Sequence, residues 1–138
     1  MSVPQLKSAL RTEETERGLR IVLPADTLFG TAPDTIAAGA APLLEETARL
    51  IAATHPREII VAGHTDGVGR DDDNVALSER RAHAVASWLR ARSAKGAPGI
   101  VEQGYGRSRP IAPNHNPDGS DSPEGRQQNR RVEIYLRS

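Results

Sequence analysis

The chain has 138 residues, with 18 basic and 18 acidic side chains, no cysteine and few aromatic residues (one Phe, one Trp and two Tyr). A formal charge of zero argues against a general nucleic-acid binder, which needs a basic excess to release counterions, and so few aromatic rings argue against a stacking surface for single strands. The absence of cysteine excludes disulfides, thiol catalysis and cysteine-based zinc or iron–sulfur sites.

The first residues differ in character from the rest of the chain. Residues 1–17 are polar with few apolar anchors, and we expect a linker or a frayed helix there, followed by one folded domain over residues 18–138. The first strand is expected over residues 19–23, where apolar side chains alternate, and Pro24 ends it. No apolar run approaches the roughly 18 residues of a membrane span. We therefore expect membrane association only through a parent chain or an anchor outside this sequence.

Two helices and a central strand are predicted in the middle of the chain. After an irregular stretch with one helical turn around residues 33–36, apolar residues at helical spacing predict a helix over 39–53. The continuous apolar run at 58–63 is typical of a central strand covered on both faces. A second helix is expected over 74–92, with Asp73 or Asn74 as its N-cap.

The last third of the chain contains two more predicted strands. Residues 95–99 are expected to break the chain before a strand over 100–103, and a long loop then leads to one or two helical turns at 123–130. The final strand covers 132–136. This order, βαβαβ(α)β, predicts a two-layer α/β (α+β) sandwich with a four-stranded mixed sheet and helices on one face.

The densest group of polar residues is Gly63-His64-Thr65-Asp66-Gly67, at the end of the expected central strand. Ligands of open α/β sheets favour the crevice beyond the strand carboxyl ends, and Arg81 on the next helix can lean back toward that place. Such a pair suits a zwitterion, because Asp66 accepts an ammonium while the planar fork of Arg81 and backbone N–H groups of the turn bind a carboxylate. The alternative is structural: Asp66 and Arg81 form an ion pair with each other, or Asp66 caps the turn.

A metal site is a further alternative. His64, Asp66 and the acidic run at 71–73 offer ligand types that zinc and calcium use, and such a site would suit a metal-assisted hydrolase. An acidic run at a helix start is also the usual complement of the helix dipole. Because no nucleophile elbow, phosphate-binding loop or dinucleotide-binding pattern occurs in the sequence, we expect no catalytic residue, no cofactor and no metal.

Several short motifs follow one another along the chain. They are Leu28-Phe29 with Ile36; Gly63-His64-Thr65-Asp66 with Gly69; Asn74-x-x-Leu77-Ser78-x-x-Arg81-Ala82-x-x-Val85; Gly104-Tyr105-Gly106 with Pro110; and Gly125-Arg126 with Asn129-Arg130-Arg131-Val132-Glu133-Ile134. Together they make the chain resemble the family of OmpA-like peptidoglycan-binding domains (porin C-termini, Pal-type lipoproteins, flagellar stator proteins and type VI secretion anchors). Blocks in this order argue strongly against coincidence.

The resemblance implies non-covalent binding of peptidoglycan through the diaminopimelate residue of the stem peptide, whose side chain ends in a free amino-acid group. By this carry-over Asp66 receives the ammonium and Arg81 the carboxylate, which agrees with the zwitterion inferred from charge and position. The resemblance also implies that Thr65 and Asn74 flank the site and that Phe29 forms a wall of its pocket. Arg131 is a further candidate for contact with the ligand. We therefore expect a periplasmic wall anchor within an outer-membrane, inner-membrane or secretion-system protein, and not an enzyme.

One departure from the family pattern is the loop at 114–122, which looks several residues longer than in many members. A longer loop beside a binding site offers a surface for another protein. It supports an alternative function, a protein-interaction module that keeps the fold but has lost wall binding.

Overall fold

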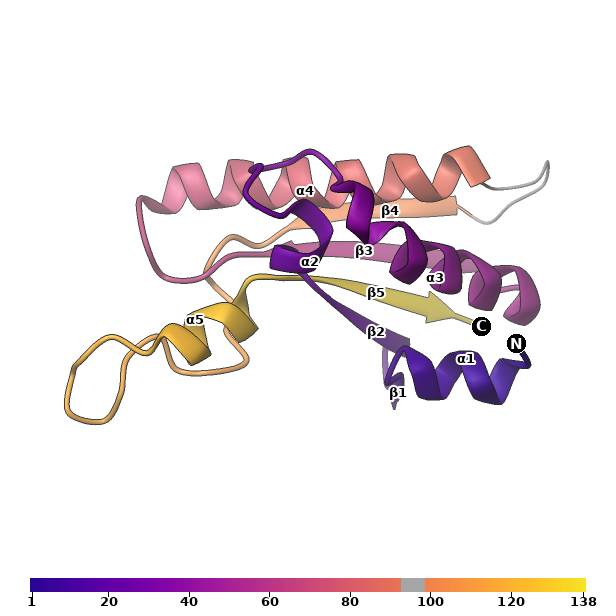
Figure 1. Ribbon diagram of the computed structural model, residues 1–138, viewed down its shortest axis with the longest axis horizontal. Helices are drawn as coiled ribbons and strands as arrows, with labels where there is room; N and C mark the ends of the chain where they lie inside the picture. The colour runs from indigo at the N-terminus through magenta and orange to yellow at the C-terminus, as the bar shows by residue number, and fades with distance from the viewer. Residues whose placement is uncertain (93–98) are drawn as a thin grey trace.

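The structure, a computed structural model, describes residues 1–92 and 99–138, so the predicted break at residues 95–98 lies outside the described residues. One mixed sheet has the strand order β1-β2-β5-β3-β4 (Figure 1). The strands are β1 Glu13–Thr15, β2 Gly18–Pro24, β3 Glu58–His64, β4 Gly99–Gly104 and β5 Arg131–Arg137. β3 and β4 are parallel, whereas the other neighbours are antiparallel. The two-layer mixed α/β fold is confirmed, with five strands where four were predicted.

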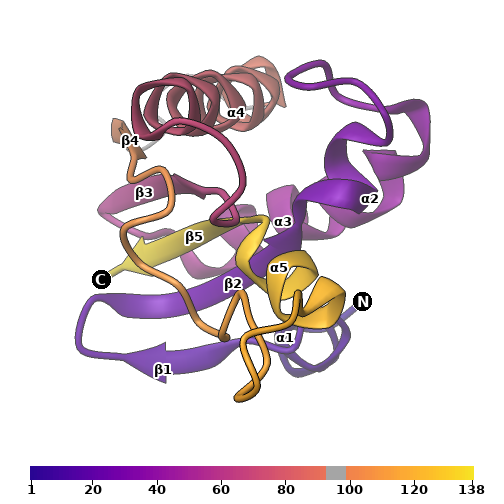
Figure 2. The ribbon, with the colours of Figure 1, turned by 90° about the vertical axis from the view of Figure 1, so that its left-hand side faces the viewer.

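The larger helices cover one face of the sheet, as Figures 1 and 2 show. The helices are α1 Val3–Ala9, α2 Ala25–Phe29, α3 Ala41–Thr54, α4 Asp71–Arg92 and α5 Pro123–Asn129, with a 3₁₀ turn at Ala38–Ala40. α5 lies at the end of the sheet where β5 begins (Figure 1). No helix among the described residues is long and apolar enough to cross a membrane.

Two local predictions in this layer were wrong. The second long helix begins at Asp71 rather than at residue 74, because three aspartates occupy its first turn and complement the helix dipole. Asn74 therefore lies inside the helix and is not its N-cap. The expected helical turn at residues 33–36 is absent, and α2 forms instead immediately after β2.

The first 17 residues differ from the linker or frayed helix that was expected. Ser2 caps α1 through a capping box with Gln5. Leu6 and Leu10, one helical turn apart, are only 2% and 5% exposed and belong to the same hydrophobic core as the sheet. β1 then pairs with β2. Two apolar side chains at the right spacing are thus enough to attach an otherwise polar segment to the core.

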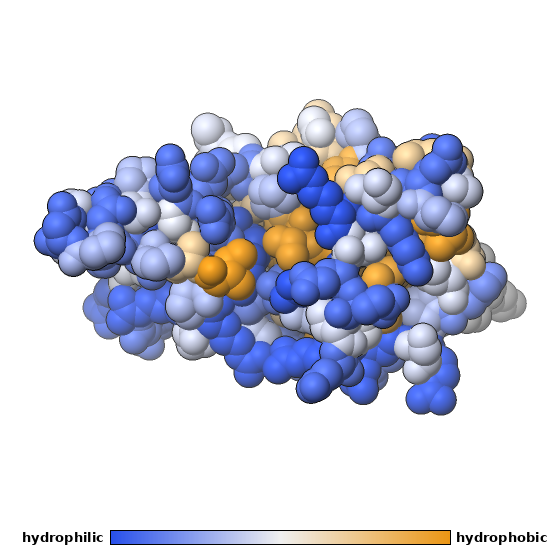
Figure 3. All heavy atoms as spheres, turned by 90° about the horizontal axis from the view of Figure 1, so that it is seen from below, coloured by the Kyte–Doolittle hydropathy of each residue, from blue (hydrophilic) through white to orange (hydrophobic). Residues whose placement is uncertain are grey.

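One face of the molecule is drawn in full in Figure 3. Figure 3 shows a mostly hydrophilic face on which hydrophobic atoms form small patches separated by charged side chains. Most of the large apolar side chains lie between the sheet and its helices. Small, separated apolar patches are normal on a solvent-exposed surface and do not by themselves indicate a docking site.

Two glycines bring α4 unusually close to the sheet. Gly63 and Gly104 face each other in the parallel β3–β4 pair. A Cβ on Gly63 would lie 2.1 Å from the Ser78 carbonyl oxygen, and one on Gly104 would lie 2.6 Å from the Glu79 backbone nitrogen. The backbone of α4 therefore packs directly on the strands at this point, which fixes the direction in which the next turn of the helix points its side chains.

A buried polar cluster occupies the other face of the sheet. Arg131 donates from Nε to Glu133 Oε2 at 2.9 Å, and the Tyr135 hydroxyl donates to Glu133 Oε1 at 2.9 Å. His64 Nε2 lies 3.4 Å from the same Oε1 without hydrogen-bond geometry. Burial alone would raise the pKa of Glu133, but His64 and the hydrogen bonds from Arg131 and Tyr135 outweigh it and lower this pKa to about 2.

We predict that Gly63→Ala destabilises the chain by about 1–3 kcal/mol, because the new methyl group forces α4 away from β3. Urea unfolding measures the loss. Gly39→Ala is the matched control, since a Cβ at Gly39 has no neighbouring atom within 4 Å. Equal stability of the two variants would show that α4 does not rest on Gly63.

We also predict that acid unfolding depends on Glu133. Its folded pKa of about 2 lies below the ordinary value of 4.5, so its ionised form stabilises the fold above pH 4.5, and this contribution is lost as the pH falls toward 2. Glu133→Gln should lower the free energy of unfolding by about 3–5 kcal/mol at pH 7, because Arg131 is left buried without a counter-charge. The free energy of unfolding of this variant should also depend less on pH between 4.5 and 2. Glu13→Gln, at an exposed pair with Arg20, should keep the wild-type dependence. A wild-type slope in Glu133→Gln would contradict the assignment.

Candidate functional site

Asp66 lies in the turn that follows β3 and is only 8% exposed. Its Oδ1 accepts the backbone N–H of Val68 at 3.1 Å, and its Oδ2 accepts Nη1 of Arg130 at 2.8 Å. The carboxylate is therefore held from two sides, by its own turn and by the residue that precedes β5. This position at the carboxyl end of the central strands is the one predicted from the sequence.

Thr65 and Asn74 hold this turn in shape. The backbone N–H of Thr65 donates to the Gly106 carbonyl at 2.9 Å, and its hydroxyl donates to the Asp66 carbonyl at 3.0 Å. The Asn74 amide donates to the Val68 carbonyl at 2.9 Å. Both side chains are nearly fully buried. Ordering of the turn accounts for both residues, and direct contact with a ligand stays a prediction.

Arg81 projects from α4 toward the loop after α2. Its Nε donates to the Pro33 carbonyl at 2.6 Å, and its guanidinium carbon lies 5.3 Å from the ring centroid of the buried Phe29. Its pKa is lowered from the ordinary value mainly because burial disfavours the charge, whereas Asp26 and Asp66 act in the opposite direction. Among the described residues, no carboxylate lies within 4.0 Å of this guanidinium.

The predicted alternative of a structural ion pair between Asp66 and Arg81 was wrong. Asp66 does form an ion pair, but its partner is Arg130. Arg81 is fixed by a carbonyl and an aromatic ring, so its Nη1 and Nη2 make no hydrogen bond within the described part of the chain. Within residues 1–92 and 99–138, Arg81 is thus a partly buried cation without a carboxylate within 4.0 Å.

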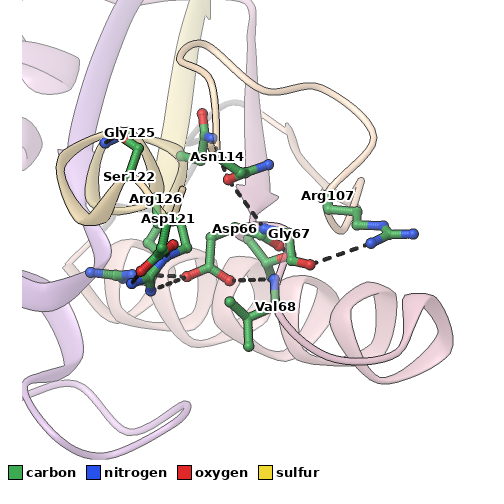
Figure 4. A network of polar contacts seen from close by, with 12 residues as sticks. Asp66, Gly67, Val68, Arg107, Asn114, Asp121, Ser122, Gly125 and Arg126 are labelled. Carbon is green, nitrogen blue, oxygen red and sulfur yellow. Dashed lines mark hydrogen bonds and ion pairs between the residues drawn. The ribbon is translucent and has the colours of Figure 1, made fainter. Parts of the chain in front are cut away.

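Arg130 links two aspartates that are far apart in the sequence. It forms a two-point contact with Asp26 of α2 at 3.1 Å for both nitrogens, while its third nitrogen binds Asp66. Figure 4 shows Arg126 beside Asp66. Its Nη1 lies 3.7 Å from Asp66 Oδ2, and two of its nitrogens bind both oxygens of Asp121 at 2.7 and 2.6 Å. This network was not predicted, because only the tertiary fold brings its members together.

Arg131 lies away from Asp66, on the sheet face opposite the helices, so its position gives no support to the predicted ligand contact. It is only 2% exposed, pairs with Glu133 and donates to the Arg109 carbonyl. Consecutive residues of an extended backbone point to opposite sides, so Arg130 and Arg131 cannot serve the same face. The alternation was visible in the sequence, since Val132 faces the helices and Arg130 shares its side.

The metal alternative is not supported by the donor positions. His64 points into the buried cluster beside Glu133, on the sheet face away from the helices, while the run Asp71–Asp73 forms the exposed first turn of α4. In residues 1–92 and 99–138, no three His, Asp or Glu side chains lie close enough together to hold a metal ion. These residues therefore do not form the centre that a metal-assisted hydrolase needs.

The long loop is attached to the site at both of its ends. Near its start, the Asn114 side chain accepts the backbone N–H of Gly67 at 3.3 Å, and near its end Asp121 binds Arg126. Between these points a bridge joins His115 to Asp121 and closes the loop on itself. Figure 1 shows the loop extending beyond α5. The site and the loop are thus one connected surface, and an interaction role for the loop stays a prediction.

The site contains equal numbers of opposite charges. Arg81, Arg126 and Arg130 are balanced by Asp26, Asp66 and Asp121. A ligand with net charge would disturb this balance, whereas a zwitterion would preserve it. Such a balance favours a ligand without net charge, because a surplus charge in a partly buried place is costly.

Three curated relatives align with the chain. It is 36% identical over 141 residues to Photosystem I P700 chlorophyll a apoprotein A2 of Gloeobacter violaceus, which covers 100% of this chain and 16% of that protein. It is 36% identical over 117 residues to Outer membrane protein A of Bordetella avium, covering 85% of this chain and 57% of that protein. It is 37% identical over 94 residues to Peptidoglycan-binding protein ArfA of Mycobacterium tuberculosis, covering 68% and 27%. The chain thus spans only part of each of these relatives, at most 57%.

Two solved structures share the fold. The periplasmic domain of Helicobacter pylori MotB superposes with a TM-score of 0.74 at 28% identity, covering 92% of this chain and 80% of that one. The cell wall anchor of the type VI secretion system from Pseudomonas aeruginosa gives a TM-score of 0.80 at 24% identity, covering 99% and 98%. The second likeness concerns the fold alone.

The family assignment follows from the sequence match and the site together. The sequence profile of the OmpA family matches residues 28–130, which include Phe29, Asp66, Arg81 and Arg130. This stretch covers most of the chain and contains β3, α4 and the turn that holds Asp66. The chain therefore belongs to the OmpA family.

Proposed function

We propose that this chain binds peptidoglycan non-covalently through the diaminopimelate residue of the stem peptide, and so anchors a parent envelope protein to the cell wall from the periplasm. The observation that carries the proposal is the guanidinium of Arg81. It is partly buried, fixed by Pro33 and Phe29, and has no carboxylate within 4.0 Å among the described residues, although Asp66 lies nearby.

The free end of diaminopimelate matches this arrangement. In this proposal its carboxylate accepts hydrogen bonds from Nη1 and Nη2 of Arg81, whose position is fixed by the hydrogen bond from Nε to the Pro33 carbonyl. Its ammonium is to bind Asp66. That carboxylate already accepts from Val68 and Arg130, but its two oxygens offer about four acceptor positions, so a third donor can be added without displacing either partner.

The relatives support wall binding as the general role. One of them, 37% identical over 94 residues, is named a peptidoglycan-binding protein. Binding and retention need no chemical step, so we propose no catalytic residue, no cofactor and no metal. Because a single amino-acid group makes a small contact, we expect modest affinity for one stem peptide, with retention on the wall arising from many neighbouring sites.

We predict that Arg81→Ala abolishes co-sedimentation with purified diaminopimelate-type sacculi. The expected loss of binding free energy is about 2–5 kcal/mol, the cost of removing one partner of a desolvated charge pair. Asp66→Asn should also abolish it, because an amide cannot neutralise an ammonium. The matched control is Arg80→Ala, which removes an exposed neighbour on α4 that pairs with Asp34 and should leave binding unchanged.

Thermal melting distinguishes a binding role from a structural one. Arg81→Ala should melt close to the wild type, since Arg81 has no ion-pair partner among the described residues. If folded wild type does not bind sacculi, or if folded Arg81→Ala binds as well as wild type, the proposal is wrong. The first of these outcomes would favour the alternative of a protein-interaction module that acts through the loop at 114–122.

A further inference from the structure

Two arginines lie beside Asp66, and each of them is held by a second aspartate. Arg130 binds Asp26 through Nε and Nη2, both at 3.1 Å, and reaches Asp66 Oδ2 with Nη1 alone, at 2.8 Å. Arg126 binds Asp121 through Nε and Nη2, at 2.7 and 2.6 Å, and its Nη1 stays 3.7 Å from the same Oδ2. Figure 4 shows Arg126 and Asp121 together, next to the Asp66 carboxylate. In both cases the two-point contact, the strong geometry for an arginine with a carboxylate, is made with the second aspartate and not with Asp66.

The electrostatics of the two arginines follow the same division. The pKa of Arg130 is raised chiefly by its hydrogen bond to Asp26, and the hydrogen bond to Asp66 is a smaller cause. The pKa of Arg126 is raised chiefly by its hydrogen bond to Asp121. Asp26 and Asp121 are thus the main counter-charges of these arginines, and Asp66 is the secondary one for both.

Asp66 keeps free acceptor positions as a result. Its Oδ1 accepts from the Val68 backbone and its Oδ2 from Arg130, whereas a carboxylate offers about four acceptor positions. An arginine released from its second aspartate could turn its planar fork onto both oxygens of Asp66. Because such an arginine is tethered beside the carboxylate, it would compete with a dissolved ammonium at a high effective concentration.

We propose that Asp26 and Asp121 are positioning residues that hold Arg130 and Arg126 back, so that the Asp66 carboxylate stays open to the ammonium of the ligand. The inference rests on the proposed function, because it concerns the ammonium that Asp66 is proposed to bind. Neither aspartate belongs to the motifs on which the family resemblance rests, and Asp121 lies in the long loop at 114–122. In this proposal the loop contributes to ligand binding through Arg126.

Two peptides that differ by one amino group test this inference by isothermal titration calorimetry. One is L-Ala–γ-D-Glu–diaminopimelate. The other carries 2-aminopimelate in place of diaminopimelate, so it keeps the distal carboxylate for Arg81 but lacks the distal ammonium. We expect wild type to bind the first peptide roughly tenfold more tightly or better, the effect of one charge-assisted hydrogen bond. The ratio of the two dissociation constants reports on the ammonium contact alone, since folding and binding at Arg81 affect both peptides.

Variants of the two aspartates connect this ratio to the arginines. Asp26→Asn and Asp121→Asn remove the charge and keep the size of the side chain. Each should weaken binding of the diaminopimelate peptide roughly three- to tenfold and change binding of the aminopimelate peptide by less than about twofold. Asp26→Glu restores a carboxylate at a half-exposed position and should retain most of the wild-type ratio.

Glu45→Gln is the matched control. It removes the same charge from an exposed ion pair with Arg92, which lies 11 residues or ~16 Å along α4 from Arg81, and it should keep the wild-type ratio. Thermal melting establishes that every variant is folded, and we expect small shifts because Asp26 and Asp121 are about half exposed.

The outcomes separate this inference from the proposed function. A wild-type ratio in folded Asp26→Asn and Asp121→Asn would overturn the inference and leave binding at Asp66 and Arg81 intact. Equal losses for the two peptides would show a merely structural role and would overturn it as well. Failure of wild type to bind either peptide would overturn the proposed function itself, and equal affinity of wild type for both peptides would overturn the ammonium contact at Asp66 and the inference with it.

Discussion

The close approach of α4 to the sheet is the constraint on which the site depends. Gly63 and Gly104 lie opposite each other in the only parallel strand pair described, and without side chains they admit the helix backbone at Ser78. Arg81 follows less than one turn later and is thereby directed at Phe29 and the loop beside it. A larger residue at either glycine would move the helix outward, and Arg81 would move with it.

The site divides its cations between two tasks. Arg130 holds Asp66 and Asp26 together and closes the gap between the turn after β3 and α2. Arg81 contacts a carbonyl and a ring, and no carboxylate lies within 4.0 Å of its guanidinium among the described residues. Without Arg130, Asp66 would be a nearly buried carboxylate supported mainly by its own turn, which is an expensive arrangement. The ion pair that stabilises Asp66 is thus separate from the ion pair that we propose for the ligand.

The long loop is attached to the turn that holds Asp66 at two places. Asp121 near the end of the loop binds Arg126, which lies beside Asp66, while the Asn114 side chain near its start accepts the backbone N–H of Gly67. The contact between Asn114 and Gly67 joins residues that lie 47 positions apart in the sequence. The shape of the turn and the position of the loop therefore depend on each other.

Periodicity and ordered motifs are local properties of the chain, and they were sufficient to predict the layered α/β fold, its main strands and helices, and the location of Asp66 at the end of the central strand and of Arg81 on the following helix. It did not reveal that residues 1–17 join the core, since Leu6 and Leu10 become anchors only where α3 and the sheet receive them. The sequence analysis also named Arg131 as a site residue, whereas the structure shows that Arg130 contacts Asp66. Which cation stabilises Asp66, and which has no carboxylate partner among the described residues, became clear from the folded chain, because those contacts join α2, α4 and the start of β5 across long stretches of sequence. The energy of a charge pair depends on distance and burial rather than on position in the sequence.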